Sequence, residues 1–170
     1  LIVHTTPSNG MVKYENPHSK EVTIIDYDGF LTSTPAYFNQ GKKRCDAIVH
    51  TTNETSYFLL NELKEKNPAN PLYESSNIED AKLQILDTLV VLNSVPNIRL
   101  DIQNYTNKIC CYCNSFPKSN IPSISTTIGA FNRLNLLAPN GIQLSEPRIE
   151  AFGFIYIELK GNQTIKINKK

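Results

Sequence analysis

The sequence predicts an α/β domain in which a central mixed β-sheet is flanked by helices. Two apolar runs, 44–50 and 57–64, have the composition of neighbouring strands. A helical pattern over 77–93 and a further apolar run over 108–114 predict a helix followed by a buried strand. This succession of strands, helix and strand is typical of a sheet whose strands are joined partly by helical connections.

Charged side chains stand on the first two of these predicted strands, with Asp46 on one and Glu62 and Lys64 on the other. Side chains alternate along a strand, so Glu62 and Lys64 point to one face while Leu63 points to the opposite face. Two carboxylates that face each other repel unless a cation lies between them, and such a pair of hard oxygen ligands suits Mg²⁺ or Mn²⁺. The pattern therefore predicts a metal site at Asp46 and Glu62, where Lys64 could hold a water or steady charge on a phosphate.

The predicted helix over 77–93 carries apolar residues at helical spacing. Asn77 is expected to be its N-cap, with Glu79 and Asp80 in the first turn, where the helix dipole favours negative charge. Pro96 is expected to close the segment. The helix would then lead into the buried strand that completes the core.

With this order of elements, Asp46, Glu62 and Lys64 resemble the motif of the PD-(D/E)xK nuclease superfamily, over about residues 20–116. The resemblance implies a restriction-endonuclease-like core. It implies that Asp46 and Glu62 bind one or two divalent metal ions, Mg²⁺ or Mn²⁺, and that Lys64 assists hydrolysis of a phosphodiester.

Two further positions bear on this resemblance. Gln84 lies on the predicted helix twenty residues after Lys64, where several nuclease groups of the superfamily carry a glutamine that faces the site. The alternative for Gln84 is an ordinary exposed helix residue. Cys45 stands before Asp46, at the place of a proline that is often absent from the family. The resemblance thus adds Gln84 to the expected catalytic residues.

The net charge of +1 predicts no overall attraction to nucleic acid, so any attraction must be local. Lys42, Lys43 and Arg44, directly before Asp46, are the expected phosphate contacts, and a solvated loop is the alternative. The resemblance implies nucleic acid as the partner, with DNA favoured over RNA. A homodimer or a larger complex is compatible with it.

A second acidic motif follows the hydrophobic run 22–25, where Asp26 and Asp28 form Asp-x-Asp-Gly. It resembles the nucleophile motif of the haloacid dehalogenase phosphatases, which implies Asp26 as nucleophile and Asp28 as general acid and base. Phe30 departs from that family's pattern, and the further acidic motifs that supply its other metal ligands are absent from the sequence. A plain turn at Asp-Gly is the preferred interpretation, with a phosphatase kept as the alternative.

Length and composition predict a single domain over residues 1–170, with a core at about 20–116 and an extension over 117–170. Apolar residues at 40% and charged residues at 19% are typical of a globular chain. We expect neither a signal peptide nor a membrane span. The four cysteines are expected to be small buried residues, with Cys111 and Cys113 on one face of their strand, as in a reducing cytoplasm.

The extension is predicted to begin with a short helix over 126–137 and to end in a β-hairpin formed by 150–160 and 164–168. A second Glu-x-Lys pattern, Glu158 and Lys160, lies on the first of these strands. No helix and strand follow it, so we interpret it as the exposed face of an edge strand.

Three functions are compatible with these patterns. The first is a metal-dependent endonuclease or exonuclease, possible in a bacterial restriction or antiviral defence system, as the resemblance implies. The second is the phosphatase built on Asp26. The third is a nuclease-like scaffold or nucleic-acid-binding subunit without catalysis, which the small size and the nearly neutral charge favour.

Overall fold

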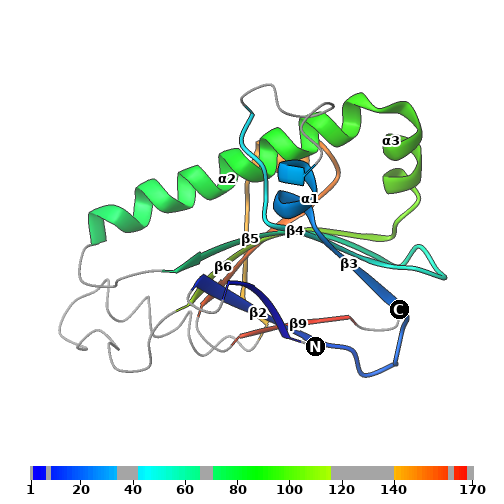
Figure 1. The fold of residues 1–170 in the computed structure, drawn as a ribbon, viewed down its shortest axis with the longest axis horizontal. Helices are drawn as coiled ribbons and strands as arrows, with labels where there is room; N and C mark the ends of the chain where they lie inside the picture. Colours follow the sequence, from blue (N-terminus) through cyan, green and yellow to red (C-terminus); the bar gives the residue numbers. More distant parts are fainter. Residues whose placement is uncertain are drawn as a thin grey trace.

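A six-stranded mixed β-sheet forms the centre of the structure, with helices over one face and a three-stranded sheet beneath the other (Figure 1). The computed structural model describes residues 2–6, 9–33, 42–65, 71–115, 140–160 and 163–167. The helix predicted over 126–137 lies outside these residues. The layered arrangement creates two apolar cores, one on each face of the central sheet.

The strands of the central sheet lie in the order β3 (Val22–Asp26), β4 (Ala47–Thr51), β5 (Tyr57–Glu65), β6 (Asn107–Ser115), β8 (Ile155–Lys160) and β7 (Ile142–Leu144). β3, β4 and β5 are antiparallel neighbours, whereas β5, β6 and β8 run parallel to one another. β7 closes the far edge in the antiparallel sense. The predicted α/β class with a mixed central sheet is confirmed.

The helices are α1 (Tyr27–Ser33), α2 (Pro71–Ser94), α3 (Pro96–Gln103) and the short α5 (Pro147–Glu150). α2 and α3 together form the crossover from β5 to the parallel strand β6. The expectation that Asn77 is the N-cap is wrong, because α2 begins at Pro71, a residue that suits the first helical turn. α2 does end before Pro96, as expected, and Pro96 then occupies the first turn of α3.

The upper core lies between α2 and the central sheet. Four residues of α2 at helical spacing are almost completely buried: Ala81, Ile85, Leu89 and Leu92. They pack with alternate residues of the strands, among them Ile48, Leu60, Cys110 and Tyr156. Each large aliphatic side chain buried there contributes about 1.5–3 kcal/mol. The apolar pattern predicted for this helix is therefore its buried face.

The lower core lies between the central sheet and the small sheet of β1 (Ile2–Thr6), β2 (Asn9–Glu15) and β9 (Thr164–Lys166). Cys111 and Cys113 point into this core and Cys110 into the upper one, because side chains alternate along β6. All four cysteines are buried and unpaired, which confirms their expected role as small buried residues.

The predicted C-terminal hairpin is wrong. β8 lies between β6 and β7 in the central sheet, while β9 pairs in parallel with β2 of the small sheet. Glu158 is 9% exposed and does not lie on an open edge, because β7 covers that side of β8. The part of the chain after residue 117 thus supplies strands to both sheets and is integral to the fold.

Candidate functional site

The three residues of the predicted metal motif lie together at one end of β4 and β5. Ala47 is opposite Asn61 in the antiparallel pair, which places Asp46 across from Glu62. The backbone N–H of Asp46 donates to the carbonyl oxygen of Asn61 at 3.0 Å and extends this pairing by one residue. Lys64 follows on the same face of β5 because side chains alternate.

Short contacts hold this group in place. The Nζ of Lys64 lies 2.5 Å from Oε1 of Glu62, and the backbone N–H of Leu63 donates to Oδ2 of Asp46 at 2.6 Å. The Glu62 side chain is completely buried, and its Oε2 has no hydrogen-bond partner among the described residues. The Lys64 side chain is 30% exposed, so the group reaches solvent on the Lys64 side.

Both carboxyl groups are difficult to ionise in this environment. Burial and the charge of Asp46 together raise the pKa of Glu62 to about 8, against the lowering effect of Lys64. Burial also raises the pKa of Asp46, against the lowering effects of the Leu63 N–H and of Lys64, while Asp28 and Asp26 add to the increase. As anions, the two groups would therefore be stabilised by an additional cation.

Asp26 and Asp28, which the sequence presented as a competing motif, lie beside Asp46. The backbone N–H of Tyr27 donates to the carbonyl oxygen of Asp46 at 2.9 Å. β3 is antiparallel to β4 with Asp26 opposite Ala47, so the end of β3 meets the start of β4. The strand pairing thus brings two motifs that are separate in the sequence into one acidic cluster of Asp26, Asp28 and Asp46.

The plain turn expected at Asp-Gly is wrong. Asp26 is the last residue of β3 and its Oδ1 accepts the backbone N–H of Gly29 at 2.9 Å, which caps the start of α1. Asp28 lies in the first turn of α1, and its Oδ1 accepts the Nε–H of Arg44 at 2.5 Å. Both carboxylates thus have structural partners.

Gln84 anchors the segment that leads into Asp46. Its Nε2 donates to the carbonyl oxygen of Arg44 at 3.0 Å. One turn further along α2, the Oγ1 of Thr88 accepts the backbone N–H of Cys45 at 2.9 Å. Gln84 therefore lies on the side of α2 that faces the site, and it contacts the backbone before Asp46 and not the carboxylates.

The basic residues before Asp46 differ in their surroundings. Lys43 is bound twice to α2, through its Nζ at 2.7 Å from Asp80 and through its backbone N–H to Asp87 at 3.0 Å. Arg44 contacts α1 through Asp28, as above. Lys42 is exposed and makes no hydrogen bond or ion pair with the described residues. Phosphate binding by this segment stays a prediction, and Lys43 and Arg44 would have to exchange partners to take part.

The donor atoms of Asp46 and Glu62 fit Mg²⁺ or Mn²⁺. Both are hard carboxylate ligands, and the buried Oε2 of Glu62 has no described partner. Mg²⁺ is commonly bound by one or two carboxylates together with waters and substrate phosphates. Within the described ranges, no group of three or more His, Cys, Asp and Glu side chains is arranged to hold a metal ion. Water or substrate would thus have to supply the other ligands.

Comparison with protein-family models, with curated proteins and with solved structures finds no match. The class that the fold and the site define is an α/β protein in which a buried glutamate, a partly buried aspartate and a lysine meet at the end of two antiparallel strands. In the described part of the chain, no helix has the length and apolar character needed to cross a membrane.

Proposed function

We propose that this protein is a metal-dependent hydrolase that cleaves phosphodiester bonds of nucleic acid. Asp46 and Glu62 would hold Mg²⁺ or Mn²⁺, and Lys64 would act beside them. The observation that carries this proposal is the completely buried Glu62 carboxylate, which faces Asp46 and pairs with Lys64 at a place that reaches solvent. The resemblance of these residues to the PD-(D/E)xK motif supports the same function.

A purely structural role explains the arrangement less well. On the same face of the sheet, the next residue after Asp46, Ile48, and the one before Glu62, Leu60, are apolar and belong to the upper core. A buried ion pair contributes little net stability, because removing its charges from water costs about as much as their attraction returns. Groups whose pKa values are raised by burial and by a neighbouring charge are concentrated at functional sites.

Each residue has a definite part in the proposed chemistry. When bound, the divalent ion would neutralise the carboxylates, polarise a phosphoryl oxygen and activate a water. Asp46 is oriented for this by the Leu63 N–H, and Glu62 by the packing around it. Lys64, which is partly exposed, can leave Glu62 to hold a phosphate oxygen or a water. Gln84 acts as a positioning residue through the backbone of Arg44.

The phosphatase alternative has less support. A nucleophilic Asp26 would have to give up the cap of α1, and Asp28 would have to leave Arg44 before it could exchange a proton. The scaffold alternative is compatible with the internal pairing of Lys43 and Arg44, which leaves less positive charge for phosphate.

Cleavage of labelled single-stranded and double-stranded DNA and RNA, with Mg²⁺ or Mn²⁺, tests the proposal. We expect Glu62→Gln and Asp46→Asn to lower the cleavage rate by at least about 100-fold, as for other groups that act on a developing charge. Asp26→Asn and the exposed Glu15→Gln on the small sheet serve as controls that retain the rate. Undiminished cutting by Glu62→Gln would refute the proposed site, and no cutting by wild type would favour the scaffold.

A further inference from the structure

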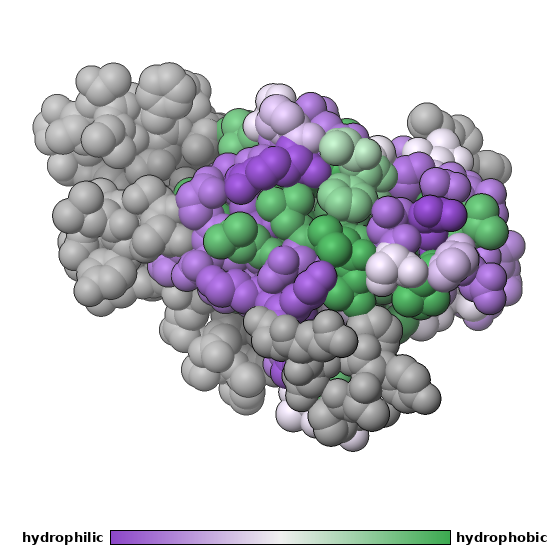
Figure 2. Space-filling view, turned by 90° about the horizontal axis from the view of Figure 1, so that it is seen from above, coloured by the Kyte–Doolittle hydropathy of each residue, from purple (hydrophilic) through white to green (hydrophobic). Residues whose placement is uncertain are grey.

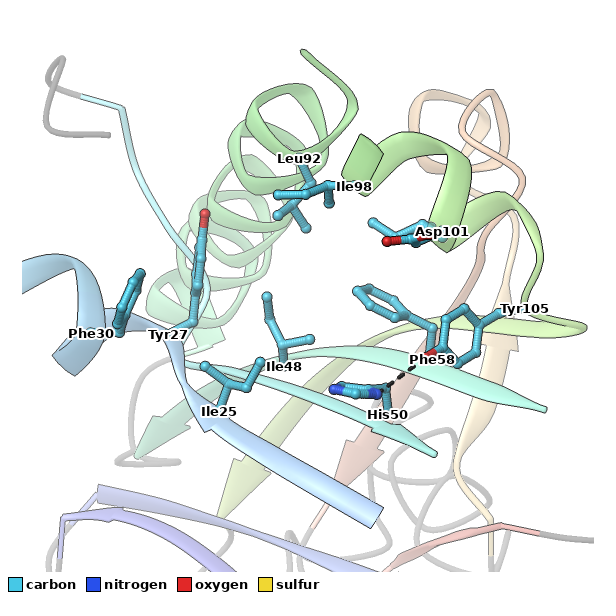
Figure 3. A pocket seen from close by; sticks show the side chains of 11 residues that line it. Ile25, Tyr27, Phe30, Ile48, His50, Phe58, Leu92, Ile98, Asp101 and Tyr105 are labelled. Carbon is cyan, nitrogen blue, oxygen red and sulfur yellow. Dashed lines mark hydrogen bonds between the residues drawn. The ribbon is translucent and has the colours of Figure 1, made fainter. Parts of the chain in front are cut away.

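An apolar pocket of about 400 Å³ opens on the helix-covered face of the central sheet (Figure 3). Ile25, Ile48 and His50 form its floor on β3 and β4, and Tyr27 and Phe30 of α1 form one wall. The end of α2 and α3 close the opposite side. Seen from the helix side, apolar side chains reach the surface in the middle of this face, with polar ones around them (Figure 2). The volume is in the range of small-ligand sites.

Polar groups of the pocket are few and are held in defined positions. The Nδ1 of His50 lies 3.1 Å from the hydroxyl of Tyr105 and 3.1 Å from the carbonyl oxygen of Thr51. The Nε2 of His50 makes no hydrogen bond to a described residue. Asp101 also lines the pocket and is exposed, and its carboxylate makes no hydrogen bond to a described residue. The lining therefore offers a ring nitrogen and a carboxylate to a ligand, besides the hydroxyls of Tyr27 and Tyr105, and the described residues of the lining include no lysine or arginine.

These features select the chemistry of a ligand. Asp101 in the lining and the acidic cluster nearby disfavour an anionic group in the pocket. The aromatic rings of the lining favour a ligand with a flat ring system. The ring planes of Phe58 and His50 make an angle of 24°, and Phe58 meets Tyr105 edge-on with ring centroids 5.4 Å apart. A carboxylate at the rim favours a ring that carries N–H donors. A nucleobase with an exocyclic amine, as in cytosine or adenine, has all of these properties.

The pocket is next to the metal motif. Ile48 of the floor follows Asp46 by two residues on the same face of the strand, a separation of about 7 Å along the chain. Tyr27 connects the two places, since its backbone N–H binds the carbonyl oxygen of Asp46 and its side chain lines the pocket. One sugar separates a base from its phosphate, so a nucleotide with its phosphate at Asp46 could place its base over Ile48.

We propose that this pocket receives an unpaired, amino-bearing nucleobase of a single-stranded nucleic acid whose phosphodiester lies at Asp46 and Glu62. The inference rests on the proposed function and specifies its substrate class. A base inside a duplex cannot enter such a pocket without leaving its stack, which costs a few kcal/mol. Single strands are therefore bound and cut in preference to duplexes, with the base stacked against the aromatic lining.

The test measures binding of short fluorescent oligocytidylate and oligothymidylate strands by anisotropy, with Ca²⁺ in place of Mg²⁺ to prevent cleavage. Phe30→Ala removes a half-exposed wall residue of the pocket, and Leu100→Ala removes an exposed apolar side chain of α3 that does not line it. We expect Phe30→Ala to weaken oligocytidylate binding by about 5- to 100-fold. Leu100→Ala should bind as wild type does.

The choice of strands tests the amine separately. Cytosine carries an exocyclic amine and thymine does not, so wild type should bind oligocytidylate more tightly, and Asp101→Asn should reduce this preference. Equal binding by Phe30→Ala and Leu100→Ala, or no preference between the strands, overturns the pocket assignment. Cleavage lost in Glu62→Gln with binding unaffected by Phe30→Ala refutes the pocket alone. Phe30-dependent binding without any cleavage by wild type refutes the proposed hydrolysis alone.

Discussion

Glu62→Gln is expected to remove a destabilisation that wild type suffers as the pH rises. The pKa of Glu62 is about 8 in the folded protein against an ordinary value of 4.5. The folded state therefore binds more protons than the unfolded chain between these values, and the free energy of unfolding falls as the pH increases. At 1.36 kcal/mol per pKa unit, the full difference is roughly 5 kcal/mol.

Between pH 5.5 and 8.5, the same linkage predicts that wild type loses about 3 kcal/mol through this group alone. Gln has the shape of the protonated acid and no charge, so the variant does not lose this stability as the pH rises. The unfolding temperature of the variant should then exceed that of wild type at pH 8.5 by roughly 6–12 °C, since about 1 kcal/mol shifts it by 2–4 °C at this size. At pH 5.5 the two should differ little, because Glu62 is protonated.

Urea or thermal denaturation at the two pH values measures this difference, with Glu15→Gln on the exposed face of the small sheet as the control. The control should follow wild type at both pH values. A variant that is equally destabilised at pH 5.5 and 8.5 would refute the reasoning, because Glu62 would then be ionised and stably paired with Lys64 throughout.

The same samples report on the proposed metal site. Mg²⁺ at about 100 times its dissociation constant should raise the stability of wild type by about 2.7 kcal/mol at pH 8.5. Glu62→Gln lacks one of the two carboxylate ligands and should gain much less. An equal gain in both proteins would place any bound cation elsewhere.

Further predictions concern contacts around the site. Asp26→Ala removes the cap of α1 and should lower the free energy of unfolding in urea by about 1 kcal/mol, whereas Asp26→Asn can still cap the helix and should lower it little. An equal decrease in both variants would exclude capping. Thr88→Val leaves a buried backbone N–H without its acceptor and should cost about 1–3 kcal/mol, and Thr88→Ser should restore most of it. The side chains of Arg148 and Lys82 lower the pKa of Glu146 to about 2, against the opposite effect of burial. The free energy of unfolding of wild type should therefore fall by about 1–2 kcal/mol relative to that of Glu146→Gln as the pH decreases from 4.5 towards 2. Parallel pH profiles of the two proteins would refute this pairing.

Much of the core followed from periodicity, because the burial of a strand or helix face leaves a local pattern. The strands near 44–50, 57–64 and 108–114 and the apolar face of the helix over 77–93 lie where that pattern predicts them. The start of α2 at Pro71 could not be found in this way. Helix ends depend on a few backbone contacts and not on a repeated pattern.

The site was predicted in part for the same reason. Asp46, Glu62 and Lys64 face one another because alternation and antiparallel pairing of adjacent strands are short-range properties. The contact of Gln84 with the Arg44 carbonyl depends on where α2 docks, which the helix pattern does not specify. The internal ion pairs of Lys43 and Arg44 depend likewise on α1 and α2.

The sequence by itself determined the buried faces of the segments 44–50, 57–64, 77–93 and 108–114, and that a carboxylate pair with a lysine occupies neighbouring strands. The tertiary structure alone decided that β8 and β9 join different sheets, that Asp26 and Asp28 lie beside Asp46, and that a pocket opens over Ile48. Burial patterns arise from the solvent preferences of each side chain and are encoded locally. Sheet order and cavities arise from packing between segments that are far apart in the chain, so no local pattern of residues predicts them.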